Sequence, residues 1–485
     1  MSDTVINATP SDRYDIAIIG AGPAGMAAAV VASARGASVI LLDDKPRSGG
    51  QIYRNVDASP LDKPQVLGPD YLRGAELTAA FAACSARYLP ATQVWHLGDN
   101  GEILCSRNGA TLRLTARQIL VATGAMERPF PIPGWQLPGV MSAGSAQVML
   151  KSDGLVHDNP VFAGTGPLLY LIVAQYLRLG VPVAAVVDTT PLANYFSAMR
   201  YALGAVREPA MLFKGVGLLN EIRKAGVPVY RGAQALEVIG NHSASGLRFQ
   251  SGGQQHEIVA EQVFLHQGVI PNLNFTRALG LEQHWNPGQL CWQPALDQWG
   301  QSSAAVISVA GDASGIVGAD AAERNGRLSA WNMLTRLEKI SQTERDQLAA
   351  ADLKALASLN AFRPFVDQLY RPLDAHRMPD NPDTVVCRCE EKTLGQLRAG
   401  FEMGAREPNQ LKSLTRCGMG PCQGRMCGHT VSELLAKWRD EPVEDVGYYR
   451  LRSPMRLLTL AEMSNFTELS ARDTLVETLA TEVKP

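Results

Sequence analysis

The feature that most constrains the fold is a glycine-rich turn, GAGPAG, between two apolar stretches near the start of the chain. In residues 13–44, RYDIAIIGAGPAGMAAAVVASARGASVILLDD, a strand-length apolar run leads directly into this turn. An alanine-rich run follows, ends at Gly36, and gives way to a second apolar run. A G-x-G-x-x-G turn in this strand–helix–strand context is typical of a dinucleotide-binding unit, so the sequence predicts an α/β protein with a Rossmann-like domain.

Each glycine of the turn has its own task in such a unit. Gly20 permits the tight turn, Gly22 lets the backbone approach a pyrophosphate, and Gly25 lets the helix pack close to the strand. The phosphates then face free N–H groups at the helix N-terminus. Asp43, which follows the second strand, is placed to accept hydrogen bonds from a ribose. Further expected contacts are the neighbouring residues Pro23, Ala24 and Asp44.

Later segments favour FAD over NAD as the ligand of this unit. Residues 119–134, ILVATGAMERPFPIPG, resemble the ATG element of two-dinucleotide flavoproteins, and residues 304–315, AAVISVAGDASG, resemble their second FAD signature. The segment 316–334 predicts a helix whose positive end faces the flavin ring and stabilises the reduced form. RSGGQIYR, 47–54, matches a flavin-side loop. The expected contacts in these segments are Gly50, Gln51, Ala122, Thr123, Gly124, Gly311, Asp312 and Ala319.

A second strand–turn–helix–strand pattern occupies residues 160–188, and its glycine turn is incomplete. Gly164 and Gly166 fill the first two glycine positions, but Leu169 stands at the third and should crowd a pyrophosphate. Either this unit binds a nicotinamide or adenine nucleotide, or it is a scaffold; the incomplete turn favours the scaffold. No C-x-x-C lies near either turn, which argues against a thiol relay of the thioredoxin-reductase type.

Net charge and targeting signals indicate the cellular compartment and the kinds of partner to expect. The net charge of −2 gives no broad attraction to nucleic acid or to an anionic membrane. The polar first residues do not read as a signal peptide, and no apolar run is long and uninterrupted enough to span a membrane. We therefore expect a cytoplasmic protein, whether free or peripheral to the inner membrane. In that reducing compartment cysteines stay thiols unless they bind metal.

Five of the eight cysteines fall within residues 387–427, which predicts a metal centre. Cys387 and Cys389 form C-x-C, and Cys422 and Cys427 form C-x4-C, 32 residues further on. Four thiolates suit a 2Fe–2S cluster or zinc; an electron carrier is favoured because the same chain is expected to hold a flavin. Cys417 and Cys422 make an equally short pair, so the ligand choice stays open, with Cys422 and Cys427 preferred. The isolated Cys84, Cys105 and Cys291 are expected to be small core residues.

Taken in order, the motifs resemble one family. GAGPAG, GGQIYR, ATGAMERPFPIPGW, GTGPLL, AGDASGIVGADAA, CRCEE and TRCGMGPCQGRMC resemble the FAD-containing A (alpha) subunits of bacterial octopine and nopaline oxidases, the opine dehydrogenases. Related subunits occur in hydrogen cyanide synthase, in D-hydroxyproline and dye-linked proline dehydrogenases, and in part of sarcosine oxidase alpha. The resemblance spans residues 12–460, and the cysteine layout resembles bacterioferritin-associated-ferredoxin (BFD)-like domains.

The resemblance implies a two-dinucleotide-binding-domain flavoprotein with a small C-terminal BFD-like domain. The implied divisions are an FAD-binding domain at 12–159 and 286–336, an inserted NAD(P)-like domain at 160–285, a linker at 337–380, the 2Fe–2S domain at 381–440 and a tail at 441–485.

It also implies a division of labour between subunits. A separate B (beta) subunit, similar to D-amino-acid and sarcosine oxidases, would carry its own FAD and oxidise a secondary amine, with FMN at the interface in some relatives. The present chain would pass electrons between FAD and the cluster, toward a membrane quinone or another acceptor. Its eight histidines show no paired-carboxylate pattern, so no catalytic residue is expected here. The alternatives are a subunit that serves glycine oxidation to cyanide, a self-contained NAD(P)H-dependent flavin reductase, and a non-catalytic assembly subunit.

Overall fold

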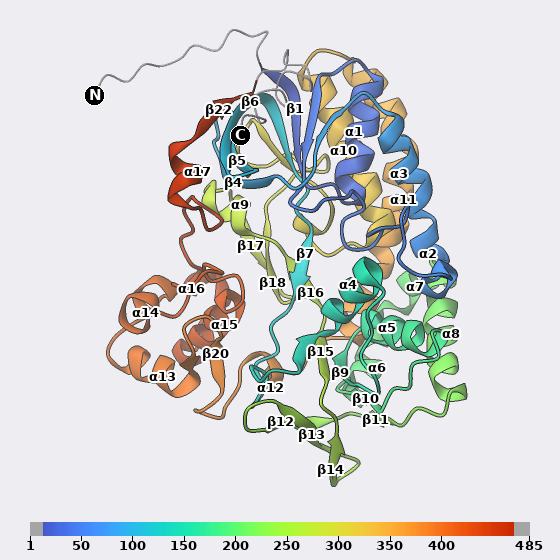
Figure 1. Ribbon diagram of the computed structural model, residues 1–485, viewed down its shortest axis with the longest axis vertical. Helices are drawn as coiled ribbons and strands as arrows, with labels where there is room; N and C mark the ends of the chain where they lie inside the picture. Colours follow the sequence, from blue (N-terminus) through green and yellow to red (C-terminus); the bar gives the residue numbers. More distant parts are fainter. Residues whose placement is uncertain (1–12, 470–485) are drawn as a thin grey trace, which may run out of the picture.

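The computed structural model describes residues 13–469 and contains three modules (Figure 1). Residue 12 and residues 470–485 of the expected domains lie outside the described residues. The first module is built on an eight-stranded sheet with the order β3-β2-β1-β6-β5-β4, and β19 and β22 also pair with β6. Its strands are β1 (Tyr14–Ile19), β2 (Val39–Leu42), β3 (Arg87–Leu89), β4 (Gln93–Leu97), β5 (Glu102–Arg107), β6 (Ala110–Val121), β19 (Ile307–Val309) and β22 (Phe466–Glu468).

The long strand β6 joins two kinds of sheet. Its C-terminal half runs parallel to β1 and β19, in the pattern of a nucleotide-binding sheet whose strands are buried on both faces. Its N-terminal half pairs antiparallel with β5 and parallel with β22, where Phe466 lies opposite Thr111. The end of the described chain thus returns to the module in which the chain begins.

Two helices pack against each other beside this sheet. Helix α1 (Pro23–Ala34) follows the glycine turn, and α10 (Ala319–Arg336) follows the 311–315 segment, as the sequence predicts. A Cβ at Gly326 would lie 2.1 Å from the carbonyl oxygen of Ala24, so the two backbones approach as closely as only glycine allows. The module is completed by η2 (Pro64–Leu67), α2 (Pro69–Leu72), α3 (Gly74–Ala83) and η4 (Gly311–Ala313).

The second module has a five-stranded parallel sheet in the order β11-β10-β9-β15-β8. Its edge strand β8 and helix α4 precede residue 160, where the sequence places the start of the inserted domain. The elements are β8 (Val140–Ser142), α4 (Ala143–Asp153), β9 (Val161–Thr165), α5 (Pro167–Arg178), β10 (Ala185–Asp188), α6 (Leu192–Ala198), η3 (Met199–Tyr201), α7 (Ala202–Ala205), α8 (Pro209–Lys224), β11 (Val229–Arg231) and β15 (Val263–Gln267), with a meander of β12 (Gln234–Gly240), β13 (Ala244–Ser251) and β14 (Gln254–Val259).

The two modules are connected by an antiparallel pair of strands, β7 (Ala125–Glu127) and β16 (Val269–Pro271), which carry the chain into and out of the second module. Beyond it lie α9 (Asn274–Ala278) and a hairpin of β17 (Gln283–Asn286) and β18 (Cys291–Pro294). The expected linker is mostly one 28-residue helix, α11 (Gln342–Leu369), which Ser341 caps and which packs on α10, α6 and α7. The linker therefore braces both modules. Among the described residues, no helix combines the length and apolarity needed to cross a membrane.

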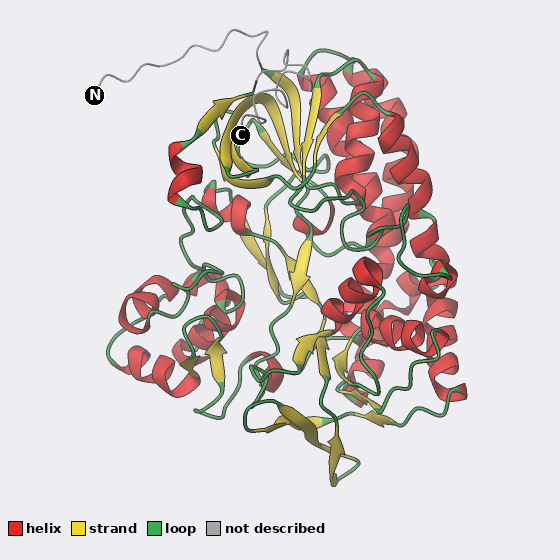
Figure 2. Ribbon diagram, in the orientation of Figure 1, coloured by secondary structure: helices red, strands yellow, loops and turns green. Residues whose placement is uncertain are grey.

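The third module contains the five cysteines between residues 387 and 427 and forms a small, mainly helical lobe beside the other two (Figure 2). It contains α12 (Asp374–Arg377), β20 (Val385–Cys387), β21 (Lys392–Thr393), α13 (Leu394–Glu402), α14 (Pro408–Thr415), α15 (Gly428–Arg439) and α16 (Val443–Val446); α17 (Leu460–Ser464) leads back to β22. The Trp135 indole N–H donates to the carbonyl oxygen of Val385, at 2.6 Å. The buried side chains of this lobe continue into the core of the first sheet, so the lobe is packed against the rest of the chain.

Candidate flavin and metal centres

A cavity of about 700 Å³ lies between the first two modules and gathers the predicted nucleotide contacts. Fourteen of the fifteen expected contact residues line it: Gly20, Gly22, Pro23, Ala24, Asp43, Asp44, Gly50, Gln51, Ala122, Thr123, Gly124, Gly311, Asp312 and Ala319. The remaining one, Gly25, lies behind the turn, where a Cβ would come within 1.9 Å of the Gly20 carbonyl oxygen. That position matches its expected task of close helix–strand packing.

The backbone leaves room for a ligand only because glycines form the cavity wall. Gly20 has φ of +110°, and a Cβ there would lie 2.4 Å from the Ala122 carbonyl oxygen. A Cβ at Gly50 would lie 2.7 Å from Cα of Gly22, so the 47–54 loop and the first turn meet backbone to backbone. Side chains at these positions would fill the cradle that a pyrophosphate needs.

The acids at the end of β2 are anchored in place. Asp43 accepts hydrogen bonds from the backbone N–H of Ala21 (2.6 Å) and of Lys45 (2.7 Å), one on each carboxylate oxygen. Burial raises the pKa of Asp43, and these two hydrogen bonds oppose the rise. Each carboxylate oxygen of Asp43 keeps a lone pair that can still accept a hydrogen bond from a ribose hydroxyl.

Two buried polar atoms around the cavity have no partner among the described residues: the Thr123 hydroxyl and Nε of Arg54. Buried polar groups are normally hydrogen-bonded. A polar ligand in the cavity would satisfy both, so the residues present fit FAD.

One cavity residue, Lys151 on α4, carries no signal in the sequence. Its ammonium group is almost completely buried and donates to the carbonyl oxygens of Gln51 (3.2 Å) and Ile52 (2.8 Å) and to Oε1 of Gln147 (3.1 Å). Burial, and to a smaller extent the neighbouring Arg54, lower the pKa of Lys151 to about 7. Lys151 fixes the 47–54 loop at the cavity wall from a point about a hundred residues further along the chain.

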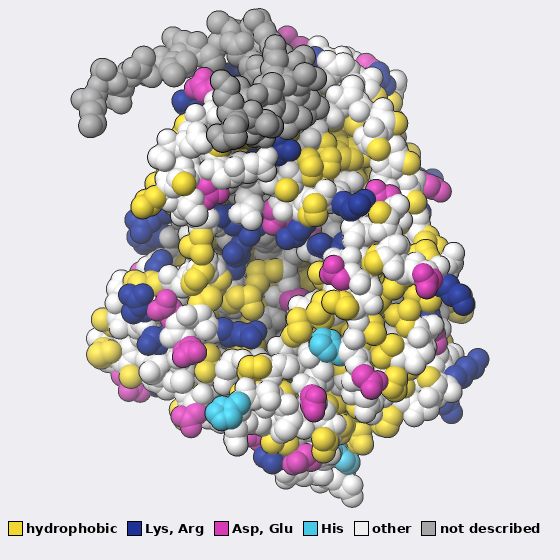
Figure 3. All heavy atoms as spheres, viewed as in Figure 1, with side chains coloured by type: hydrophobic (Ala, Val, Ile, Leu, Met, Phe, Trp, Pro, Cys, Tyr) yellow, Lys and Arg dark blue, Asp and Glu magenta, His cyan; other side chains and the backbone are white. Residues whose placement is uncertain are grey.

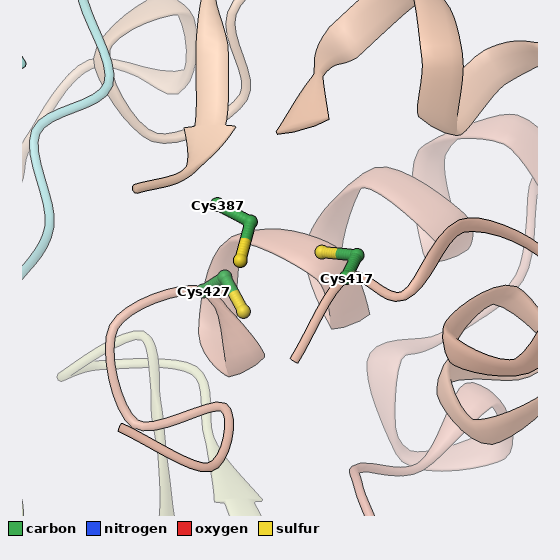
Figure 4. A group of neighbouring side chains, drawn as sticks. All are labelled: Cys387, Cys417 and Cys427. Carbon is green, nitrogen blue, oxygen red and sulfur yellow. The ribbon is translucent and has the colours of Figure 1, made fainter. Parts of the chain in front are cut away.

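The five late cysteines form two adjoining groups. The sulfur atoms of Cys387, Cys417 and Cys427 all lie within 4.8 Å of one another and are buried (Figure 4). Cys389 and Cys422 form the second group: both the backbone N–H and the side chain of Cys422 hydrogen-bond with the Cys389 thiol. Cys389 is exposed and Cys422 partly buried. The expected ligands thus divide into Cys387 with Cys427 and Cys389 with Cys422, while Cys417 joins the first pair.

The buried group favours a thiolate before any metal is considered. Hydrogen bonds from Cys417 and Cys427, and from the backbone of Gly418 and Glu390, hold the pKa of Cys387 well below its usual value. Hydrogen bonds with Cys387 and Cys417, together with burial, raise the pKa of Cys427 well above the usual value. A cation would resolve this competition, because metal-bound cysteine is deprotonated. The donor set therefore fits an iron–sulfur cluster.

Glycines in the cysteine loop make room for neighbouring side chains. A Cβ at Gly418 or at Gly424 would lie 2.6 Å or 2.5 Å from ring atoms of Tyr449. A Cβ at Gly420 would lie 2.2 Å from Cβ of Cys389, so this glycine lets the two cysteine segments meet. The Tyr449 hydroxyl donates to the carbonyl oxygen of Cys417 at 3.0 Å.

The isolated cysteines largely behave as expected. Cys105 and Cys291 are buried, and burial raises the pKa of each thiol. Cys84 is only partly buried, because it ends helix α3 near the surface.

The second glycine turn is as tight as the first, and the His266 side chain lies beside it. A Cβ at Gly164 would lie 1.6 Å from the carbonyl oxygen of His266, and one at Gly166 would lie 3.1 Å from its Nε2. The other nitrogen of the His266 ring lies 2.7 Å from a Glu127 carboxylate oxygen, which adds negative charge beside the turn. Asp188, the counterpart of Asp43, is buried and accepts a hydrogen bond from the backbone N–H of Thr190.

Comparison with known proteins matches both sites. The family model described as "Pyridine nucleotide-disulphide oxidoreductase" matches residues 14–167, and the model described as "BFD-like [2Fe-2S] binding domain" matches residues 385–437, a range that includes all five late cysteines. The chain is 44% identical to the opine oxidase A chain of Agrobacterium tumefaciens (strain Ach5), over 94% of this chain and 92% of that protein. It is 32% identical to "Hydrogen cyanide synthase subunit HcnB" of Pseudomonas aeruginosa, over 92% of this chain and 98% of that protein.

A solved structure supports the whole architecture. The crystal structure of L-proline dehydrogenase from P. horikoshii superimposes with a TM-score of 0.68 at 18% identity, covering 93% of this chain and 79% of that chain. Fold and sites together define a flavin-dependent oxidoreductase with a BFD-like [2Fe-2S] domain, which confirms the predicted fold class and enzyme class. The chain belongs to the family of opine oxidase A (alpha) subunits, which confirms the resemblance.

Proposed function

We propose that this chain is the electron-transferring FAD/2Fe–2S component of a heteromeric dehydrogenase that oxidises an opine or a related secondary amine. The opine oxidase relatives support the substrate class, and their naming by subunits supports the presence of a second component. The B (beta) subunit, which resembles D-amino-acid and sarcosine oxidases and holds its own FAD, carries out the oxidation of the amine. The family models and the relatives compared above do not name FMN, and the proposal does not include it.

The observation that carries the proposal is that the flavin cavity and the cysteine loop adjoin. Arg456 lines the cavity and pairs with Asp44 at 3.2 Å. Arg425, three residues after Cys422, is half-buried; burial lowers its pKa most, and the charges of Arg456, Cys422 and Asp44 also act on that pKa. Charges at the cavity edge and at the thiols thus act on the same guanidinium. On this face, Lys and Arg side chains gather in the recess between the first module and the cysteine lobe (Figure 3).

The residues of the chain divide the work of electron transfer. When bound, FAD supplies exchange of one or two electrons, and the cluster supplies single-electron transfer. Gly20, Gly22 and Gly50 admit the pyrophosphate, and Asp43 orients the ribose. The N-terminus of α10 at Ala319 points its positive end into the cavity. The proposed cluster ligands, in the two pairs that the structure brings together, are Cys387 with Cys427 and Cys389 with Cys422.

The altered second glycine turn supports the scaffold alternative over a self-contained NAD(P)H-dependent reductase. Leu169 is fully buried where a third glycine is usual, and the His266 ring lies beside Gly166. Glu127 beside them disfavours a pyrophosphate through like charge. We therefore propose that electrons enter from the partner flavoprotein and leave to a quinone or another acceptor.

The proposal is tested with the chain co-expressed with the product of its neighbouring open reading frame. Octopine, nopaline, proline derivatives and glycine are each added under anaerobic conditions without an acceptor, and an artificial electron acceptor is then added to measure turnover. Bleaching of the flavin and a cluster EPR signal with an opine, and neither change with NADH alone, is the expected result. Rapid bleaching of the isolated chain by NADH would favour the reductase instead. Formation of cyanide from glycine would instead show that the complex acts as a hydrogen cyanide synthase, as the name of the HcnB relative states for that protein.

A further inference from the structure

One segment, residues 192–224, exposes large apolar side chains far more densely than the rest of the described chain. Among the described residues, half of the large hydrophobic side chains that are exposed fall between residues 192 and 219. Leu203 is 85% exposed, Phe213 75% and Phe196 73%. The others are Leu192, Tyr195, Met199, Val206, Met211, Val216 and Leu219. A monomeric soluble protein rarely leaves so many large apolar groups close together in water, which makes this segment a candidate docking surface.

The segment has a fixed framework. It comprises α6, η3, α7 and α8. Helices α7 and α8 lie at the right-hand edge of the second module (Figure 1). Helices α6 and α7 pack on α11, and α8 packs on α5. The inward residues Ala198, Ala205 and Leu218 are buried, so the outward residues are exposed because the segment is folded, not because it is loose.

The charges on this segment have one sign where they face water. All five cations are exposed: Arg200, Arg207, Lys214, Arg223 and Lys224. Both acids are partly buried and engaged, Glu208 with the Ser358 hydroxyl and Glu221 with Arg178. The segment has a net charge of +3, whereas the whole chain has −2. The overall charge thus conceals a locally cationic surface.

We propose that the surface formed by residues 192–224 docks on an anionic lipid membrane. Short surface helices with protruding Phe and Leu and with Lys and Arg at their margins bind the interface between headgroups and acyl chains. Anionic headgroups complement the exposed cations, each of which adds attraction near the surface. A second copy of this chain fits less well, because a two-fold contact would bring the same cations together.

Helix α8 also borders the flavin cavity. Gly217 and Leu218 line it, together with Leu168 and Leu171 of α5, and so do the ion pairs of Lys214 with Asp70 and of Glu221 with Arg178. The helix that faces the lipid in this proposal therefore also forms part of the cavity wall.

Vesicle sedimentation of the full-length chain tests the docking without substrate or partner. Vesicles of phosphatidylcholine are compared with vesicles of phosphatidylcholine mixed with phosphatidylglycerol, at low and high salt. The wild type should bind the anionic vesicles and should bind less at high salt. The variant F196S/L203S/F213S should bind at least about tenfold more weakly, because apolar burial is lost. R207E/K224E should lose the preference for anionic lipid.

Matched controls use equally exposed residues elsewhere. Leu457 and Leu460 are 73% and 84% exposed, and L457S/L460S should bind like the wild type. R450E/R452E controls for charge. Unchanged flavin content and circular dichroism establish that each variant is folded.

Three outcomes overturn the proposal: no wild-type binding to either vesicle, a triple variant that binds like the wild type, or a triple variant that loses a co-purifying protein or a self-association while keeping its vesicle binding. Each leaves the flavin–cluster proposal untouched, because vesicle binding requires no electron transfer.

Discussion

Arg456 Nη2 lies 3.2 Å from a carboxylate oxygen of Asp44, although 412 residues separate the two along the chain. Asp44 ends the first βαβ unit and Arg456 belongs to the segment after the cysteine lobe; both line the flavin cavity. The pair closes the cavity only when the whole chain has folded. The last described residues then continue to β22, which pairs with β6 of the same module.

Loss of Arg456 should weaken flavin binding more than stability. Both side chains are roughly one-third exposed, so the ion pair itself contributes about 0–1 kcal/mol to folding. Without the guanidinium, however, only the longer contact with Lys45, at 3.4 Å, opposes the Asp44 charge in the cavity that a pyrophosphate would enter. We expect R456A to raise the Kd for FAD several-fold in a fluorescence titration of the apoprotein. R452A, in the same exposed segment, should leave the Kd unchanged; an equal effect in both variants would assign the loss to the segment as a whole.

Gly20 and Gly36 both have positive φ, but only Gly20 has a neighbour in the way. A Cβ at Gly20 would lie 2.4 Å from a backbone oxygen, whereas nothing lies within 4 Å of one at Gly36. We expect G36A to lower the free energy of unfolding by about 1 kcal/mol, the usual cost of this backbone conformation. G20A should cost more and abolish FAD retention. Urea unfolding and the flavin-to-protein absorbance ratio measure the two effects; similar losses in both variants would contradict the cradle geometry.

The sequence predicts the chemistry of the two sites well, and the reason is local. Each glycine fingerprint and each cysteine pair acts through backbone within a few residues, so spacing alone selects Gly20, Gly22, Asp43 and the C-x-C pair as candidates. The family models at both ends of the chain match the same segments.

What spacing does not predict depends on contacts between distant segments. Lys151 appears in the sequence as an ordinary helical lysine, and only the fold brings it to the carbonyl oxygens of Gln51 and Ile52. Cys417 raises the question of a fifth thiol, but only the structure places it with Cys387 and Cys427 rather than with Cys422. Net charge averages over the whole surface and so hides the cationic segment 192–224.

Serine substitutions can separate cluster ligands from the fifth thiol. If Cys387, Cys389, Cys422 and Cys427 are the ligands, C417S should keep about two iron atoms per chain with matching sulfide. C427S should lose most of both, because one thiolate of the buried pair is removed. Iron and sulfide assays on anaerobically purified protein, with EPR of the reduced state, provide the measurement. Loss of iron from C417S with iron retained in C422S would instead place Cys417 among the ligands.

The same preparations decide between iron and zinc. Four thiolates accept either metal, so the donor set alone does not select one. We expect iron and acid-labile sulfide in the wild type, and their removal by a chelator under reducing conditions should abolish the EPR signal while leaving the flavin bound. Zinc without sulfide would exclude electron transfer through this lobe.

The buried Lys151 should make stability depend on pH in a defined direction. Burial lowers its folded-state pKa to about 7, below the usual value of 10.5, so between these pH values the unfolded chain binds more protons than the folded one. The free energy of unfolding contributed by this group therefore rises with pH from about 7 to about 10.5, by a few kcal/mol at most. Below pH 7 the penalty for burying the charge is present in full.

K151M, similar in length and uncharged, should unfold at nearly the same urea concentration at pH 7 and pH 9.5 once other titrations are subtracted, whereas the wild type gains stability over that range. The exposed Lys354 gives the matched control, K354M, which should follow the wild type. A parallel pH dependence in K151M and the wild type would show that Lys151 titrates as it does in water, and its hydrogen bonds to the 47–54 loop would then be those of an ordinary ammonium group.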